Sequence, residues 1–206
     1  DQAGLALGIL DEMEKIYKSV PGYEKSFEIG VILNNKATVY LVQLETQILT
    51  EQNINKEEMM QDLDHAKKYT LAAIKIYEKW IEEMGELTED EIRLKVAPFF
   101  KENDPALMEV GAEAVLENRV DDIKVAQIET KRRLSVSLTN LGFINRYKGN
   151  LEEAKKNYET AINLWDRNYT AQDNLNMLLD RPIQKRSLID KLFPPEKDKE
   201  TEKENS

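Results

Sequence analysis

Cysteine is absent from this chain of 206 residues, and histidine occurs once, as His65. The lack of cysteine excludes disulfide bonds, thiolate metal sites and cysteine nucleophiles. A single histidine also makes a histidine-based catalytic triad or a multi-histidine metal site improbable. We expect His65 to be an ordinary surface or interface residue. The sequence contains no glycine-rich phosphate loop, no nucleophile elbow and no metal-ligand spacing. We therefore predict a protein that is not an enzyme and that has no catalytic residue, metal or cofactor.

The chain has fewer basic than acidic residues. It contains 29 lysine and arginine residues and 39 aspartate and glutamate residues, so its net charge is −10. Nucleic-acid binding requires clustered basic residues, so we do not expect it. No apolar run approaches the roughly 18 residues of a membrane span. The chain begins with Asp1 rather than methionine, which together with the missing cysteine favours an exported or periplasmic protein. A cytoplasmic protein is the alternative.

Glycine and proline are few, at 8 and 6 residues, whereas charged residues make up 33% of the chain. This composition is typical of an all-α protein. The spacing of apolar residues predicts about eight helices. Their approximate ranges are 2–20, 24–51, 55–84, 89–98, 105–117, 120–147, 151–168 and 169–179, with a short further candidate at 184–192. We expect one helical domain over 1–193, with a helical insertion at 85–117 and a disordered charged tail over 194–206.

The most informative segment is 138–168, LTNLGFINRYKGNLEEAKKNYETAINLWDRN. It predicts two antiparallel helices joined by a turn at 148–150. Small residues stand where the helices must touch, with Gly142 on the first helix and Ala154 and Ala161 on the second. Such a pair cannot bury its apolar face alone and stacks on neighbouring helices in a solenoid. The segment therefore indicates binding rather than catalysis.

This order of residues resembles the tetratricopeptide repeat. In that family a large apolar residue, a leucine–glycine pair, an alanine, an aromatic residue and a second alanine recur in a unit of about 34 residues. Here those places are taken by Leu138, Leu141-Gly142, Ala154, Tyr158 and Ala161. The resemblance implies an irregular, right-handed solenoid of antiparallel helix pairs, with its clear repeat over 135–168.

A second, degenerate copy of the repeat is predicted over about 31–84. In this copy Ala66, Thr70 and Ala73 would match Ala154, Tyr158 and Ala161. The first helix of the pair lacks the leucine–glycine signature.

In a helical solenoid, the first helices of successive pairs line a concave surface that binds peptides or protein segments. The candidate groove residues are amide, aromatic, charged and apolar side chains on these helices: Asn35, Lys36, Tyr40, Gln43, Thr139, Asn140, Phe143, Arg146, Tyr147, Asp173, Asn174 and Met177. Amides there could bond an extended peptide backbone, and Arg146 could meet a carboxylate. The alternative is that the aromatic residues are buried against the helical insertion at 85–117 and the amides are merely solvated.

The only compact basic cluster is Lys131-Arg132-Arg133. It could dock an acidic partner or a phosphate. The simpler interpretation, which we favour, is a solvated helix face that pairs with neighbouring acidic residues such as Glu129.

The sequence thus predicts a non-catalytic scaffold for protein–protein interaction, which binds another protein or a peptide segment in its concave groove. The alternative is a ligand- or peptide-binding regulator, or a transport-accessory protein, with an enclosed helical pocket. An open polar groove would favour the first interpretation, and a closed apolar pocket the second. The sequence leaves the oligomeric state open.

Overall fold

The computed structural model describes residues 2–50, 55–101 and 111–183. These residues form seven α-helices, one 3₁₀ turn and no strand, which confirms the all-α prediction. The helices are α1 (Gln2–Ser19), α2 (Phe27–Thr50), α3 (Lys56–Met84), α4 (Glu89–Val96), α5 (Ala112–Tyr147), α6 (Leu151–Leu164) and α7 (Tyr169–Leu178), and the 3₁₀ turn is Ala97–Phe99. None of the described helices is long and apolar enough to cross a membrane.

The expected number of about eight helices is wrong for the described part of the chain, which has seven. The sequence predicts two separate helices, 105–117 and 120–147, with a break at 118–119. In the structure a single helix, α5, runs without interruption from Ala112 to Tyr147. No glycine or proline stands between 112 and 141 to end it, and Leu116, Val120 and Ile123 are buried on one continuous face. The predicted start at 104–105, the helix at 184–192 and the tail at 194–206 lie outside the described residues.

Local capping signals set several helix ends. Thr88 and Glu91 form a capping box at the start of α4, because each side chain bonds to the backbone of the other residue. The Asn55 side chain accepts a 3.0 Å hydrogen bond from the backbone of Glu57 at the start of α3. Pro21-Gly22 follows α1, which ends close to the predicted position 20, but α2 begins only at Phe27 rather than near position 24, since turns occupy the residues between.

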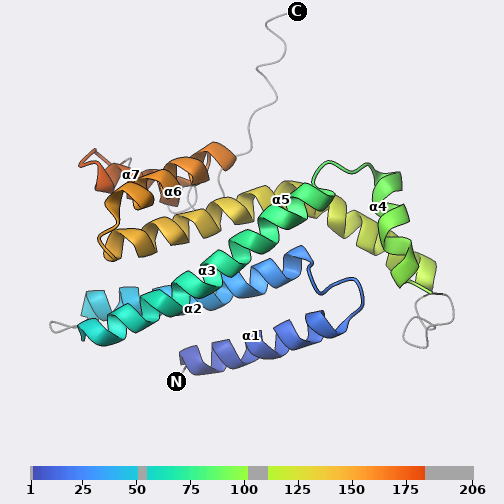
Figure 1. Cartoon of the computed structure of the whole chain (residues 1–206), viewed down its shortest axis with the longest axis horizontal. Helices are drawn as coiled ribbons and strands as arrows, with labels where there is room; N and C mark the ends of the chain where they lie inside the picture. The colour runs from blue at the N-terminus through green and yellow to red at the C-terminus, as the bar shows by residue number, and fades with distance from the viewer. Residues whose placement is uncertain (1, 51–54, 102–110, 184–206) are drawn as a thin grey trace, which may run out of the picture.

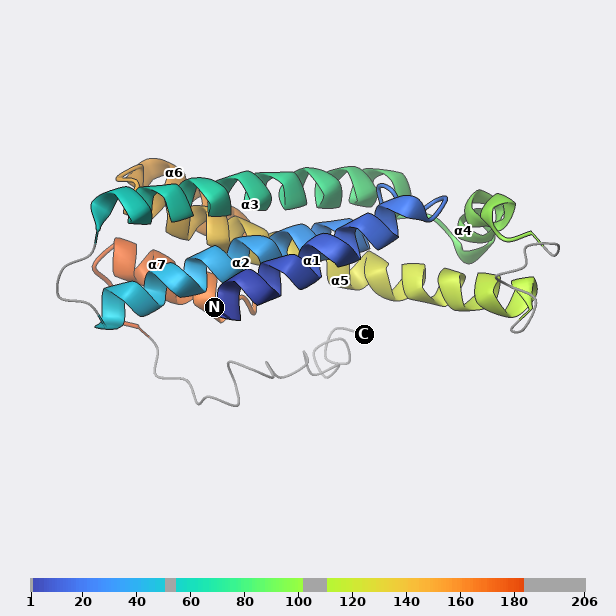
Figure 2. The ribbon, with the colours of Figure 1, turned by 90° about the horizontal axis from the view of Figure 1, so that it is seen from below.

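Two antiparallel helix hairpins, α2–α3 and α5–α6, make up most of the fold. Helix α5 also packs along α3, which joins the hairpins (Figure 1). Helix α1 packs on α2, α7 packs on α6, and α4 lies beside the first half of α5. Figure 2 shows α3 along one side of the molecule, with α6 on the same side, while α2 crosses obliquely from the opposite side toward α3.

The core runs through three consecutive clusters of buried side chains. Near α4 the cluster centres on Trp80, Ile92 and Ile123. The middle cluster includes Tyr77 and Leu134, and the third cluster lies near the far ends of α2 and α3. Helix α2 contributes buried residues to all three clusters and so runs along the whole core.

Both hairpins are closed by a glycine packed against a buried tyrosine. A Cβ atom built on Gly142 would lie 2.4 Å from Cε1 of Tyr158, and one built on Gly30 would lie 2.4 Å from Cε1 of Tyr77. Only glycine lets the helices approach this closely, since real Cβ contacts are essentially never shorter than 3.0 Å. The first hairpin therefore has a large-residue–glycine pair, Ile29-Gly30, in the place of Leu141-Gly142. It lies just before the range predicted for the degenerate copy.

Candidate partner-binding groove

Two adjoining hollows lie between α2, α5 and the connection from α6 to α7. Their volumes are about 440 Å³ and about 300 Å³, and they share Val136, Trp165 and Arg167 as lining residues. We call their combined surface the groove. Its other lining residues are Val31, Asn34, Asn35, Thr38, Tyr77, Glu129, Arg132, Arg133, Thr139, Asn140, Asn168, Tyr169 and Thr170.

Amide and hydroxyl groups form the part of the groove where α2 meets α5. The side-chain oxygen of Asn34 accepts hydrogen bonds from the Ser137 hydroxyl at 2.7 Å and from the Asn140 amide at 3.2 Å. Ser137 is buried, whereas Asn34 and Asn140 are partly exposed. The bonds therefore fix the amide groups in place while leaving them accessible from the groove.

A buried network of neutral hydrogen bonds holds the α6–α7 end of the groove. Asn168 donates through its side-chain nitrogen to the hydroxyls of Ser135 and Thr139, at 2.8 and 2.9 Å. Its side-chain oxygen accepts from the backbone of Ala171 and so caps α7. Ser135 in turn donates to the carbonyl of Ala161 at 2.6 Å. This end of the groove is thus fixed by hydrogen bonds that join α5, α6 and α7.

Three arginines, Arg132, Arg133 and Arg167, line the groove of an otherwise acidic chain, together with one carboxylate, Glu129. Arg132 donates to Glu129 at 2.7 Å, and its guanidinium lies 5.8 Å from the ring centre of Trp165. Arg133 lies over the ring of Phe27 at 5.1 Å, and its buried Nη1 has no hydrogen-bond partner among the described residues. Arg133 is thus partly shielded from water, which strengthens its attraction to an incoming anion, whereas Arg132 is exposed and already paired with Glu129.

The charge of Arg133 also affects the pKa of Tyr77, which lines the groove. Burial raises the pKa of Tyr77 above its usual range, and the nearby Arg133 guanidinium opposes that rise. Tyr77 therefore stays a neutral phenol and brings no negative charge to the groove.

Three of the twelve predicted groove residues line the groove, namely Asn35, Thr139 and Asn140. Asn35 is exposed on α2, whereas Thr139 is buried, with only 5% of its surface exposed. Gln43 lines a separate hollow between α1 and α2.

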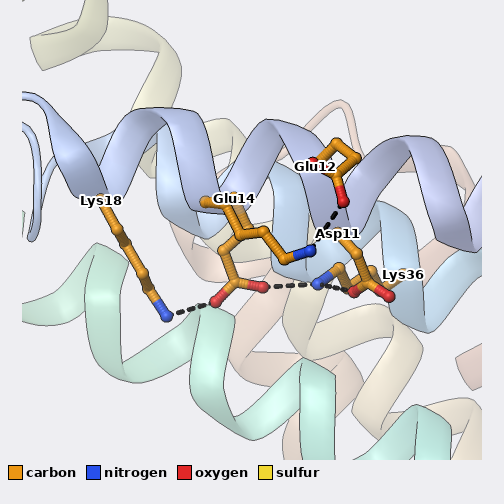
Figure 3. A network of polar contacts seen from close by, with 6 residues as sticks. Asp11, Glu12, Glu14, Lys18 and Lys36 are labelled. Atoms are coloured by element: carbon orange, nitrogen blue, oxygen red, sulfur yellow. Dashed lines mark hydrogen bonds and ion pairs between the residues drawn. The ribbon is translucent and has the colours of Figure 1, made fainter.

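Lys36 faces α1 rather than the groove. Its side chain is only 3% exposed and pairs with Asp11 at 2.6 Å and also with Glu14 (Figure 3). Lys18 pairs with the same Glu14 carboxylate from the next turn of α1. The ammonium group of Lys36 is thus engaged in fastening α1 to α2.

The predicted aromatic residues belong to the third core cluster. Tyr40 stacks on His65 with ring centres 5.0 Å apart, which places both between α2 and α3. Phe143 and Tyr147 lie 4.6 Å apart and pack against that cluster. All three rings are half-buried against this cluster, at the end of the core away from α4, and not against the insertion as the alternative interpretation expected.

The remaining predicted residues lie outside the groove lining. The Arg146 guanidinium lies 5.7 Å from the ring centre of Tyr147. On α7, Asn174 is buried, Asp173 is half-buried and Met177 is exposed. Contact between these residues and a partner stays a prediction.

Several residues that line the groove are missing from the predicted groove residues, although the spacing of polar residues along α5 indicates a shared face. Glu129, Arg132, Arg133, Val136 and Asn140 recur at helical spacing and share one face. Arg132 does pair with Glu129, as expected for a solvated face, but it lines the groove as well. Trp165 and Arg167 lie in the connection between α6 and α7, where no periodic pattern marks them.

Within the described ranges, no group of three or more histidine, aspartate or glutamate residues is placed to hold a metal ion.

Comparison with protein families, curated proteins and solved structures finds no match to this chain. A functional assignment therefore depends on the groove and its chemistry.

Proposed function

We propose that this chain is a non-catalytic, tetratricopeptide-like interaction module that holds an acidic segment of a partner protein in the groove. The observation that carries the proposal is the placement of Arg132 and Arg133 beside the accessible amides of Asn34, Asn35 and Asn140. Guanidinium groups bind carboxylates strongly, and amides can bond a peptide backbone. Acidic side chains on an extended segment would meet both.

The openness of the groove favours a protein segment over an enclosed small ligand. Asn35, Arg132 and Val136 on its rim are exposed to solvent. Small-molecule sites are more often concave, mostly apolar and nearly closed. The ligand-binding regulator with an enclosed pocket is therefore the weaker of the two functions considered.

The likeness between the two hairpins also supports the proposal. Each pairs a glycine of its first helix with a tyrosine of its second, and a Cβ atom added to either glycine would lie 2.4 Å from the tyrosine ring. In a tetratricopeptide-like arrangement the first helices, α2 and α5, would line the concave side, and these two helices supply most of the groove.

The test is a double variant, Arg132→Gln/Arg133→Gln, compared with the native protein for capture of partners from the source organism. We expect a captured partner to be released by about 0.5 M salt, since exposed charge pairs are screened at high ionic strength. We expect the double variant to bind at least tenfold more weakly, because charge-assisted hydrogen bonds contribute about 1.5–3 kcal/mol each.

The matched control is Lys124→Gln/Lys131→Gln, which removes the same charge from the same helix. Lys124 pairs with Glu89 and Lys131 with Glu86, and neither lysine lines the groove. This control should bind as the native protein does, with both variants showing unchanged helical circular dichroism. Equal binding by the arginine variant and the native protein would overturn the proposal.

A further inference from the structure

The groove continues into a third hollow, of about 620 Å³, between the first turns of α1 and the middle of α2. We call it the α1–α2 hollow. Thr38 lines both this hollow and the groove, so the two hollows adjoin at that residue. The chemistry changes along the way, because Ala3, Ala6, Val39 and Val42 form an apolar floor in the α1–α2 hollow.

The α1–α2 hollow also has an accessible entrance. Val42 is 53% exposed, and Thr38 and Thr46 on the same face of α2 are exposed too. Gln43 and Gln47 stand at its edge and could bond a peptide backbone. None of the described residues that line the hollow is charged, in contrast to the arginine end of the groove.

From these observations we infer that the partner segment is bipartite, with acidic residues at the arginine end and apolar side chains seated in the α1–α2 hollow. This inference rests on the proposed function and specifies its partner. Positive charge at one end selects carboxylates, and the uncharged apolar floor at the other end selects aliphatic side chains.

The length of α2 sets the spacing within such a segment. Asn35 stands at the arginine end, and Val42 and Thr46 stand in the α1–α2 hollow. At 1.5 Å per residue along a helix, the two regions are roughly 10–17 Å apart. An extended peptide advances about 3.3 Å per residue, so its acidic and apolar residues should be about three to five positions apart.

The experiment measures binding of fluorescently labelled peptides to the full chain. The parent peptide carries two glutamates in a serine–threonine background. Test peptides add two leucines at spacings of about two to eight residues, on either side of the glutamates, so that both directions are sampled. We expect a spacing of about three to five residues, in one direction, to bind at least tenfold more tightly than the parent.

Two variants on α2 test whether the tighter binding of the leucine-containing peptides depends on the α1–α2 hollow. Val42→Asp introduces a charge in the α1–α2 hollow and should abolish the tenfold gain of the best test peptide over the acidic parent. Leu49→Asp introduces the same charge on the same helix, at a residue that is 84% exposed and lies beyond the hollow, and should retain the gain.

The outcomes separate this inference from the function on which it rests. If the parent binds, and loses binding in Arg132→Gln/Arg133→Gln, but no spacing improves on it, the bipartite segment is wrong and the proposed function stands. A gain that survives Val42→Asp also overturns the inference. If the parent and every test peptide bind equally to the native protein and to the arginine variant, the proposed function fails as well.

Discussion

The two hairpins share one contact and differ in length. In both, a glycine of the first helix packs against a fully buried tyrosine of the second: Gly30 on Tyr77, and Gly142 on Tyr158. Gly142 lies five residues before α5 ends at Tyr147, whereas Gly30 lies 20 residues before α2 ends at Thr50. The long hairpin therefore projects by roughly four extra helical turns. One glycine–tyrosine contact marks the crossing in each hairpin, whereas the length of the helices beyond it differs between them.

The extra length changes the surface available for binding. The projecting part of α2 and α3 packs over the C-terminal end of α5, where it partly buries Phe143 and Tyr147. It also provides Val42 and Gln43, which line the α1–α2 hollow. The long hairpin thus closes one part of the expected concave surface and extends the groove in another direction.

Removing the two tyrosines should have the largest effect. We expect Tyr77→Ala and Tyr158→Ala each to lower the free energy of unfolding by about 3–5 kcal/mol, because each leaves a large cavity at a hairpin crossing. The measurement is urea denaturation of the two variants and the native protein. Similar losses in the free energy of unfolding would show that the glycine–tyrosine contact stabilises both hairpins to the same degree.

A clearly smaller loss at one tyrosine would break the likeness between the hairpins. Leu71→Ala on α3 serves as a control, since Leu71 is 45% exposed and its truncation should cost far less.

The sequence was sufficient for the short hairpin because its signature is compact. Gly142 and Tyr158 stand 16 positions apart, and the two alanines flank the tyrosine. In the long hairpin the same contact joins Gly30 and Tyr77, 47 positions apart, and matching by spacing alone selected Ala66, Thr70 and Ala73 instead. Those three residues are indeed fully buried, but they lie in the projecting part or beside it.

The groove was predicted less completely than the helices, for a related reason. Helix spacing identified the face of α5 that carries Thr139 and Asn140, but periodicity alone cannot tell which helix covers a face. Lys36 and Tyr40 share α2 with Asn35, yet Lys36 turns toward α1 and Tyr40 toward α3. Their positions depend on packing between helices distant in sequence, which no local pattern encodes.

Adding a methyl group at each crossing should have the next largest effect. Gly30→Ala and Gly142→Ala would each place a Cβ atom 2.4 Å from a buried tyrosine ring. Overpacking of this kind costs about 1–3 kcal/mol, which we expect to see as a loss in the free energy of unfolding. The matched control is Gly8→Ala within α1, where nothing lies within 4 Å of the added atom.

Gly8→Ala should instead raise stability by about 0.5–1 kcal/mol, since alanine is the better residue in a helix. If Gly30→Ala were as favourable as this control while Gly142→Ala was costly, the long hairpin would not depend on its close crossing.

The helices that flank the hairpins are fastened by different chemistry, and this difference predicts the smallest effect. Helix α1 has no buried residue over Gln2–Ser19 and is tied to α2 by Lys36 with Asp11 and Glu14. Helix α7 is tied by the neutral hydrogen bonds of Asn168 with Ser135 and Thr139. Of these two attachments, the first alone contains carboxylates that titrate in acid.

Acid should therefore loosen α1 before α7. Burial tends to raise the pKa of Glu14, but hydrogen bonds and charge from Lys18 and Lys36 outweigh it and hold the pKa below its ordinary value of 4.5. A carboxylate with a depressed pKa stabilises the fold above the ordinary value, and this contribution is lost as the pH falls below about 4.5. We expect a loss of about 1 kcal/mol or less, since Glu14 keeps some contact with water. Amide NMR signals should change along α1 and persist along α7, and Glu14→Gln should remove most of that pH dependence. Simultaneous loss of both helices on acidification would contradict the separate fastening of α1.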